Sequence, residues 1–168
     1  MAFRSDKTQL LHACVQDTRC EASIQTLVSN MAPTKSPPIR GIMETCLYVD
    51  DLDAAAHFYQ EILGFQLVSR FESRHVFFRV GDSMLLLFDP SQSCQGKDVP
   101  GHGATGPGHV AFHLQREALA DWRDQLIASG VEVEQEVEWG ESGGFSLYFR
   151  DPAGNSLELT CPETWNPR

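Results

Sequence analysis

The sequence predicts an α+β fold in which two βαβββ modules pair into a cup-shaped, mostly antiparallel sheet. Two observations lead to this prediction. A pattern of one strand, one helix and three further strands occurs twice, at 41–90 and again at 108–162. Individual residues also recur at matching places, since the segment Leu-Leu-Leu-Phe-Asp-Pro at 85–90 corresponds to Leu-Glu-Leu-Thr-Cys-Pro at 157–162. An internal repeat explains both observations.

The first copy has a clear start and stop for each element. Asp50 or Asp51 can cap a helix whose apolar residues fall on one stripe, and Gly64 is a natural end for that helix. Gly81 and Asp82 form a hairpin signal between the last two strands. The strands of this copy are expected at 42–49, 66–71, 75–80 and 83–88.

The second copy repeats this order after a connector rich in Gly, Pro and Ser at 89–107. Its helix is expected at 117–129 and ends at Gly130, and residues 151–155 form a turn before the last strand. The strands are expected at 109–115, 131–139, 145–150 and 156–160.

The chain outside the two modules shows no strand pattern. Residues 1–40 end in a Pro-rich stretch and are predicted to be an N-terminal tail and linker, with a weak helix possible at 8–28. We therefore expect one domain at 41–162, followed by a C-terminal tail at 163–168.

Composition excludes several classes of protein. The 168 residues carry 13 Lys and Arg against 23 Asp and Glu, and the net charge of −10 disfavours nucleic-acid binding. No apolar run approaches the roughly 20 residues that span a membrane, and the N-terminus lacks the apolar core of a secretory signal. Five Cys without a CxxC pair favour reduced thiols, so we expect a cytoplasmic protein.

The repeat makes Glu44 equivalent to His109, and Leu86 equivalent to Glu158. If the modules pair about a pseudo-twofold axis, Glu44, His109 and Glu158 can meet on one face of the sheet. One imidazole and two carboxylates suit a divalent ion such as Mn²⁺, Fe²⁺, Ni²⁺, Zn²⁺ or Mg²⁺. Each residue taken alone could also be an ordinary polar strand residue.

Four further residues are predicted to contact a substrate in this cup. Cys46 and Tyr48 share a strand face with Glu44, Leu86 lies beside the metal, and Trp139 precedes a Gly-rich loop at the cup mouth. Core packing is the alternative for Cys46 and Tyr48. Glu44 and Glu158 are the strong bases of the set, so either could act as a general base.

Three segments carry a family resemblance. Residues 44–65, 106–112 and 149–159 resemble the first opening, the second opening and the closing strand pair of the glyoxalase/bleomycin resistance protein/dioxygenase superfamily, also called vicinal oxygen chelate proteins. The resemblance covers about 41–162. It implies a cup-shaped sheet with a divalent metal on its floor, held by residues of the first and last strands of each module.

The sequence departs from this family pattern at two positions. Leu86 cannot bind a metal, and Glu44 stands where related three-ligand enzymes usually have His. We expect a metal-dependent enzyme, forming a homodimer, that acts on a small substrate chelated through adjacent oxygens, with lyase, isomerase or dioxygenase chemistry. The alternative is a metal-free protein that binds a small molecule, like the bleomycin-resistance members of the family.

Overall fold

The computed structural model describes residues 36–96, 99–140 and 143–165. Its contacts divide the chain into two units, Met1–Arg40 and Gly41–Arg168, and every described helix and strand belongs to the second. The helix expected at 8–28 lies outside the described residues.

The first module follows the predicted order. Asp51 caps its helix by accepting hydrogen bonds from the backbone N–H groups of Asp53 and Ala54. The helix continues as one turn of π-helix and ends before Gly64, which has a φ of +70°. The elements are β1 (Glu44–Tyr48), α3 (Leu52–His57), η1 (Phe58–Ile62), β2 (Gln66–Phe71), β3 (His75–Val80) and β4 (Ser83–Phe88).

The second module repeats this order after a connector that contains a short helix, α4 (Pro90–Ser93), begun by Asp89 as its cap and by Pro90 at its first position. One predicted strand is too long. The strand expected from 131 starts at Gln135, because Val131 still donates a backbone hydrogen bond to Leu126 at the end of the helix. The elements are β5 (His109–His113), η2 (Arg116–Ala118), α5 (Leu119–Ala128), β6 (Gln135–Trp139), β7 (Gly144–Arg150), β8 (Ser156–Thr160) and η4 (Pro162–Thr164).

The strands form two four-stranded sheets with matching topology, ordered β1-β4-β3-β2 and β5-β8-β7-β6. The first and last strands of each module pair in parallel, and the other neighbours are antiparallel. Leu86 pairs with Cys46 in the first sheet just as Glu158 pairs with Ala111 in the second. The predicted α+β fold of two βαβββ modules is therefore confirmed.

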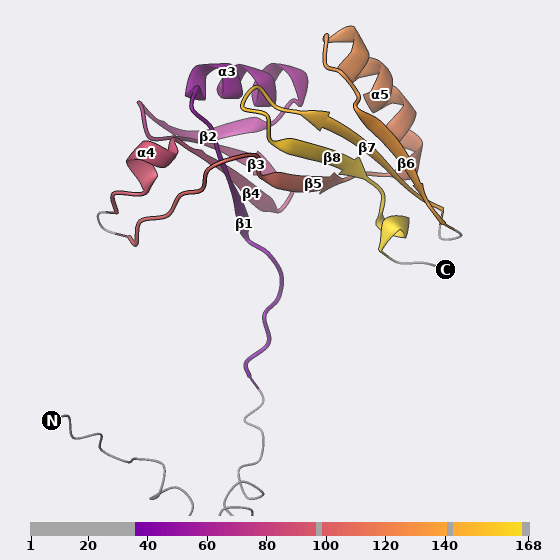
Figure 1. The fold of residues 1–168 in the computed structure, drawn as a ribbon. Coiled ribbons are helices and arrows are strands. Elements are labelled where there is room, and N and C mark those ends of the chain that lie inside the picture. The colour runs from indigo at the N-terminus through magenta and orange to yellow at the C-terminus, as the bar shows by residue number, and fades with distance from the viewer. Residues whose placement is uncertain (1–35, 97–98, 141–142, 166–168) are drawn as a thin grey trace, which may run out of the picture. The chain divides into compact units, whose positions relative to one another are not determined.

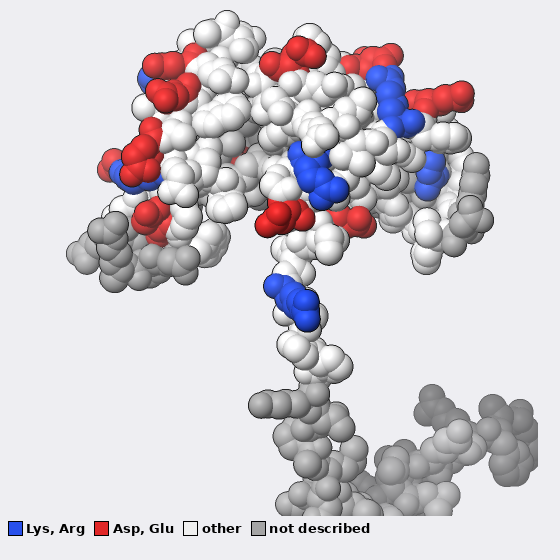
Figure 2. Space-filling view, turned by 180° about the vertical axis from the view of Figure 1, so that it is seen from behind, with Lys and Arg blue, Asp and Glu red and all other residues white. Residues whose placement is uncertain are grey.

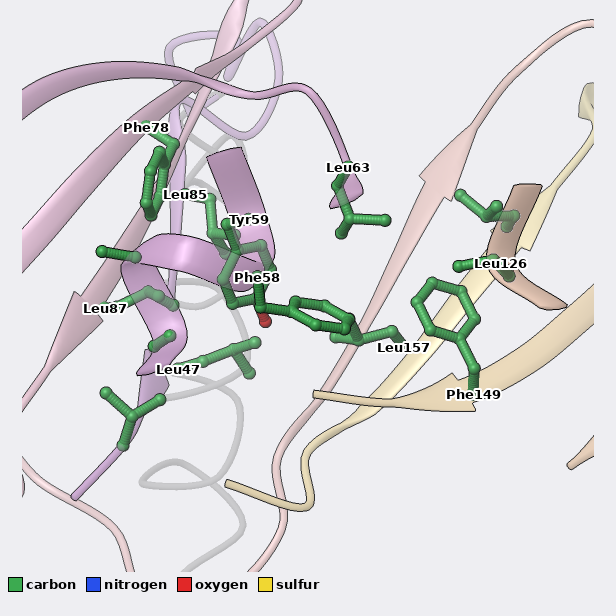
Figure 3. Close-up of a cluster of buried hydrophobic side chains, with 14 of the residues drawn as sticks. Leu47, Phe58, Tyr59, Leu63, Phe78, Leu85, Leu87, Leu126, Phe149 and Leu157 are labelled. Atoms are coloured by element: carbon green, nitrogen blue, oxygen red, sulfur yellow. The ribbon is translucent and has the colours of Figure 1, made fainter. Parts of the chain in front are cut away.

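One hydrophobic core joins the helix-side faces of the two modules. Helices α3 and α5 lie on the same side of the sheets (Figure 1). Leu47 of β1 and Leu157 of β8 belong to the same buried cluster, and the rings of Phe58 and Phe149 have centroids 6.5 Å apart (Figure 3). Burial of aromatic and aliphatic side chains from both modules is the main force that holds them together.

The surface agrees with the acidic composition. Acidic side chains lie in separate groups on the face shown in Figure 2, with wide uncharged areas between them. No described helix is long and apolar enough to cross a membrane. Three cysteines fall within the described ranges, and all three have free thiols: Cys46, Cys94 and Cys161.

Candidate functional site

The strand registers fix which side chains share the face opposite the core. Glu158 on β8 lies between Ala111 on β5 and Tyr148 on β7. The equivalent row of the first module has Leu86 between Cys46 and Phe77. The central position is therefore an apolar Leu86 in the first module and an ionisable Glu158 in the second, and the neighbouring Phe77 corresponds to Tyr148.

His109 and Glu158, two of the three predicted metal ligands, lie side by side. The Nε2 atom of His109 is 3.4 Å from Oε2 of Glu158, and the exposed fractions of the two side chains are 51% and 9%. The His109 imidazole is thus open to solvent or substrate on one side. The Glu158 carboxylate is held inside the sheet face.

A contact with the backbone places a proton on one nitrogen of the His109 ring. Its Nδ1 atom is 3.1 Å from the carbonyl oxygen of Ser156. A carbonyl only accepts, so Nδ1 carries a proton, and when the ring is neutral Nε2 presents a lone pair to the carboxylate of Glu158. Either a proton or a cation must join these two acceptor atoms.

The spacing of this pair suits a shared metal ion. Two ligands at about 2.1 Å from a metal, at a tetrahedral angle, stand about 3.4 Å apart. The observed separation of 3.4 Å matches this value. The bond from Nδ1 to a backbone carbonyl is also the usual outer-shell support for a metal-binding imidazole. His109 and Glu158 therefore fit two ligands of a divalent cation.

The other carboxylate oxygen of Glu158 is fixed by a buried hydroxyl. Ser146 Oγ donates to Oε1 of Glu158 at 2.5 Å, and it accepts a hydrogen bond from the indole Nε1 of Trp139 at 2.8 Å. Ser146 Oγ is also 3.0 Å from Oγ1 of Thr160. Trp139, predicted to contact substrate, reaches the site through this chain of hydrogen bonds.

Tyr148 is a further polar group at the pair, and the sequence prediction did not include it. Its ring lies nearly parallel to the ring of His109, with centroids 6.4 Å apart. Burial first, then the charge of Glu158 and a hydrogen bond with it, raise the pKa of the Tyr148 phenol. The phenol therefore stays protonated near neutral pH and can donate a hydrogen bond beside the carboxylate.

Glu44, the third predicted ligand, is exposed and lies with His109 on the lining of a hollow of about 580 Å³. The hollow runs along β5 and the starts of β1 and β4. Within the described ranges, no group of three or more His, Cys, Asp and Glu side chains is close enough to hold a metal ion. The structure thus brings together His109 and Glu158, and the convergence of Glu44 with them stays a prediction.

The remaining predicted substrate contacts lie on the first module. Burial, followed by the charge of Glu44, raises the pKa of the Cys46 thiol, which makes Cys46 a weak nucleophile. Leu86 is 7% exposed. The Tyr48 hydroxyl is 2.9 Å from Nδ1 of His102, and the His102 ring packs edge-on against Phe88 at 4.6 Å. The connector residue His102 thus covers one end of this apolar face.

Ser146, Tyr148 and His102 were missed for different reasons. Ser146 and Tyr148 are two residues apart on β7, so they share one face of that strand. Pairing β7 with β8 places this face beside Glu158, and that pairing would have identified both residues. His102 lies in the irregular connector, where no periodicity indicates the direction of a side chain.

Comparisons with known proteins agree with this fold. Residues 41–159 match the model of the Glyoxalase/Bleomycin resistance protein/Dioxygenase superfamily. The chain is 28% identical over 121 residues to the metallothiol transferase FosB of Bacillus licheniformis, covering 72% of this chain and 75% of FosB.

Solved structures show the same similarity. The crystal structure of lactoylglutathione lyase from Agrobacterium tumefaciens is 41% identical, with a TM-score of 0.74, and the match covers 77% of this chain and 98% of that one. The fosfomycin resistance protein FosX from Listeria monocytogenes shares the fold, with 24% identity, a TM-score of 0.57, and coverage of 73% of this chain and 91% of FosX.

Proposed function

Because the chain belongs to the glyoxalase/bleomycin resistance protein/dioxygenase superfamily, we propose that it is a metal-dependent enzyme for a small substrate that binds the metal through adjacent oxygens. The main support is the His109–Glu158 pair, in which Nε2 of His109 lies 3.4 Å from a carboxylate oxygen and Nδ1 is held by the Ser156 carbonyl. The FosB and lactoylglutathione lyase relatives add support, since both names denote enzymes that transfer or cleave small groups.

Glu44 is the third ligand in this proposal, supplied by a second copy of the chain. One core joins the helix-side faces of both sheets, and Glu44 and His109 lie on the opposite faces. Within one chain Glu44 lines the same hollow as His109, but no third His, Cys, Asp or Glu of the described residues completes the pair there. A second copy that covers the exposed sheet face would present its Glu44 to the pair. The exposed Ile42 and Met43, 81% and 72% exposed, lie next to Glu44 and would be covered in such a homodimer.

The metal, when bound, would act as a Lewis acid on a substrate oxygen. The chain's own groups would position the reactants. Tyr148, which keeps its proton near neutral pH, donates a hydrogen bond to a substrate oxygen beside Glu158. Ser146 holds one oxygen of Glu158 in place. Glu44 would double as the general base once the substrate displaces it from the metal, because it is a carboxylate on an exposed part of the strand face. Leu86 supplies no ligand, so a coordination position stays open for the substrate.

Metal content and metal affinity test the proposal. Protein purified without added metal is analysed for Mn, Fe, Ni, Zn and Mg, and the stripped protein is titrated with Mn²⁺ by calorimetry. Glu158→Gln should weaken binding by at least about 100-fold, because it replaces an anionic ligand with a neutral amide of the same size. The control Glu61→Gln, on an exposed turn of η1, should bind as the wild type does. Equal binding by wild type and Glu158→Gln would refute the site.

Mixing two inactive variants tests where Glu44 comes from. Glu44→Ala and His109→Ala each destroy both sites of a dimer. After subunit exchange, a mixed dimer has one intact site if the ligands come from different copies, which restores about a quarter of the wild-type sites. No recovery after exchange would show that each site takes all its ligands from one chain.

A second candidate function is metal-free binding of a flat small molecule. The first module favours it, because Phe71, His75, Phe88 and Tyr48 form one cross-strand row on four neighbouring strands. Within this row the rings of Phe71 and His75 stack at 5.9 Å. In that case purified protein would contain no stoichiometric metal, and added Mn²⁺ would release no measurable heat.

A further inference from the structure

A buried asparagine lies where strands of both modules meet. Asn155 is 1% exposed and closes the turn that begins at Asp151, just before β8. Its side-chain amide uses both hydrogens, one toward Oδ2 of Asp151 at 2.9 Å and one toward the carbonyl oxygen of Tyr48 at 3.2 Å. Its Oδ1 accepts a hydrogen bond from the backbone N–H of Gly108 at 2.7 Å. One side chain therefore holds the end of β1, the approach to β5 and the start of β8.

The backbone at this junction is closely packed. Ser156 N–H donates to the carbonyl oxygen of Gly108 at 2.9 Å, so Gly108 is held from both sides. A Cβ atom on Gly108 would lie 2.8 Å from Cδ2 of Leu47 and 3.3 Å from Oδ1 of Asn155. Any side chain at position 108 would therefore have to displace the Leu47 side chain and press against Asn155.

This junction is one residue away from His109 on β5 and one residue away from Ser156 on β8, whose carbonyl oxygen lies against the His109 ring. His109 follows Gly108, and Ser156 follows Asn155. The hydrogen bond from His109 Nδ1 to the Ser156 carbonyl therefore joins the two residues that directly follow Gly108 and Asn155. A shift of Gly108 against Asn155 would change the direction of the His109 ring, and with it the distance from Nε2 to Glu158.

We infer that Asn155 is a positioning residue: it sets the register of β5 against β8, keeps His109 in the Nδ1–H form, and ties that geometry to β1, the strand of Glu44. The part of this inference that concerns a metal ion rests on the proposed function. The part that concerns the His109 ring does not, because it can be measured in metal-free protein.

Three variants separate positioning from stability. Asn155→Ala removes all the junction contacts of the side chain. Gly108→Ala keeps every hydrogen-bonding group but adds a methyl group that crowds Leu47 and Asn155. Tyr59→Phe is the matched control, since Tyr59 donates to Oδ2 of the same Asp151 but touches neither Gly108 nor Tyr48 through that bond. Urea unfolding of each variant confirms that it is folded and ranks its stability.

Two measurements follow on the folded proteins. Long-range ¹⁵N NMR of the histidine rings, assigned with His109→Gln, reports the tautomer of His109 without metal. We expect Nδ1–H in the wild type and in Tyr59→Phe, and a mixture with Nε2–H in Asn155→Ala and Gly108→Ala. Calorimetry with Mn²⁺ should show about tenfold weaker binding for the two junction variants and less than about threefold for Tyr59→Phe.

The outcomes are distinguishable. If Asn155→Ala keeps the wild-type tautomer, or if Tyr59→Phe changes the tautomer as much as the junction variants, the inference is overturned. If the wild type binds no Mn²⁺ while the tautomer changes as expected, the proposed metal site fails and the positioning role of Asn155 stands.

Discussion

Replacing Tyr59 with Phe should remove one bond between the modules, from η1 to the turn before β8, at a predictable cost in stability. Tyr59 is 0% exposed, and its hydroxyl donates to the buried carboxylate of Asp151 at 2.9 Å. The ring contacts with Phe58 at 5.3 Å and Phe65 at 6.0 Å survive in the variant. The loss is therefore one hydrogen bond to a charged group, about 1.5–3 kcal/mol of unfolding free energy, and we expect a thermal midpoint about 3–12 °C lower.

The effect should depend on pH in one direction. Burial first, then the charge of Asp151 and the hydrogen bond to it, raise the pKa of Tyr59. The unfolded phenol ionises near pH 10, while the folded phenol still holds its proton. The stability that Tyr59 contributes is therefore complete below about pH 10 and is lost as the pH rises further. The difference between wild type and Tyr59→Phe should shrink above that pH.

Urea unfolding at pH 8 and pH 10.5, followed by tryptophan fluorescence, measures both effects. Tyr48→Phe is the control, because its hydroxyl reaches the imidazole of His102 and not a buried carboxylate, so about 1 kcal/mol or less should be lost. A loss below about 0.5 kcal/mol for Tyr59→Phe at pH 8, or a difference that grows at pH 10.5, would refute this account of the Tyr59–Asp151 bond.

Three further predictions concern the site and the chain boundary. Ser146→Ala should lower Mn²⁺ affinity about 10–100-fold in calorimetry, because Glu158 loses the donor that fixes Oε1; unchanged affinity would exclude this role. Leu86→Glu should raise Mn²⁺ affinity and lower turnover by adding a ligand at the position equivalent to Glu158; equal or weaker binding would contradict the repeat-based placement. A chain that starts at Ser36 should stay in solution and keep its thermal midpoint within a few degrees, and precipitation on expression would argue against the boundary at 41.

The repeat was enough to predict the fold and the equivalence of Leu86 with Glu158. Equivalent strands have equivalent pairing partners in the two sheets. Aligning the two sequence copies therefore also predicts which residues lie opposite each other on neighbouring strands. It also predicted that His109 and Glu158 are neighbours. A single-sequence pattern carries this information because strand parity and strand order together fix the face and the row of a residue.

The position of Glu44 could not be obtained in the same way. Pseudo-symmetry relates the two modules but does not determine which faces meet, and the core shared by Leu47 and Leu157 depends on tertiary packing. The predicted strand at 131–139 began too early, for a local reason. Val131 has β-propensity, but its backbone N–H is already bonded to the end of α5.

The unequal halves of the repeat have a consequence for how this protein can change. The ionisable row that contains Glu158 lies on one sheet, and the apolar row that contains Leu86 and Phe77 lies on the other. Substitutions on β3 and β4 can therefore alter the shape of the apolar wall without touching a ligand, while those on β7 and β8 alter reactivity. The repeat has thus placed the shape of the apolar wall and the reactive groups on different sheets. A library of variants confined to β3 and β4 is therefore a direct route to new substrate selectivity.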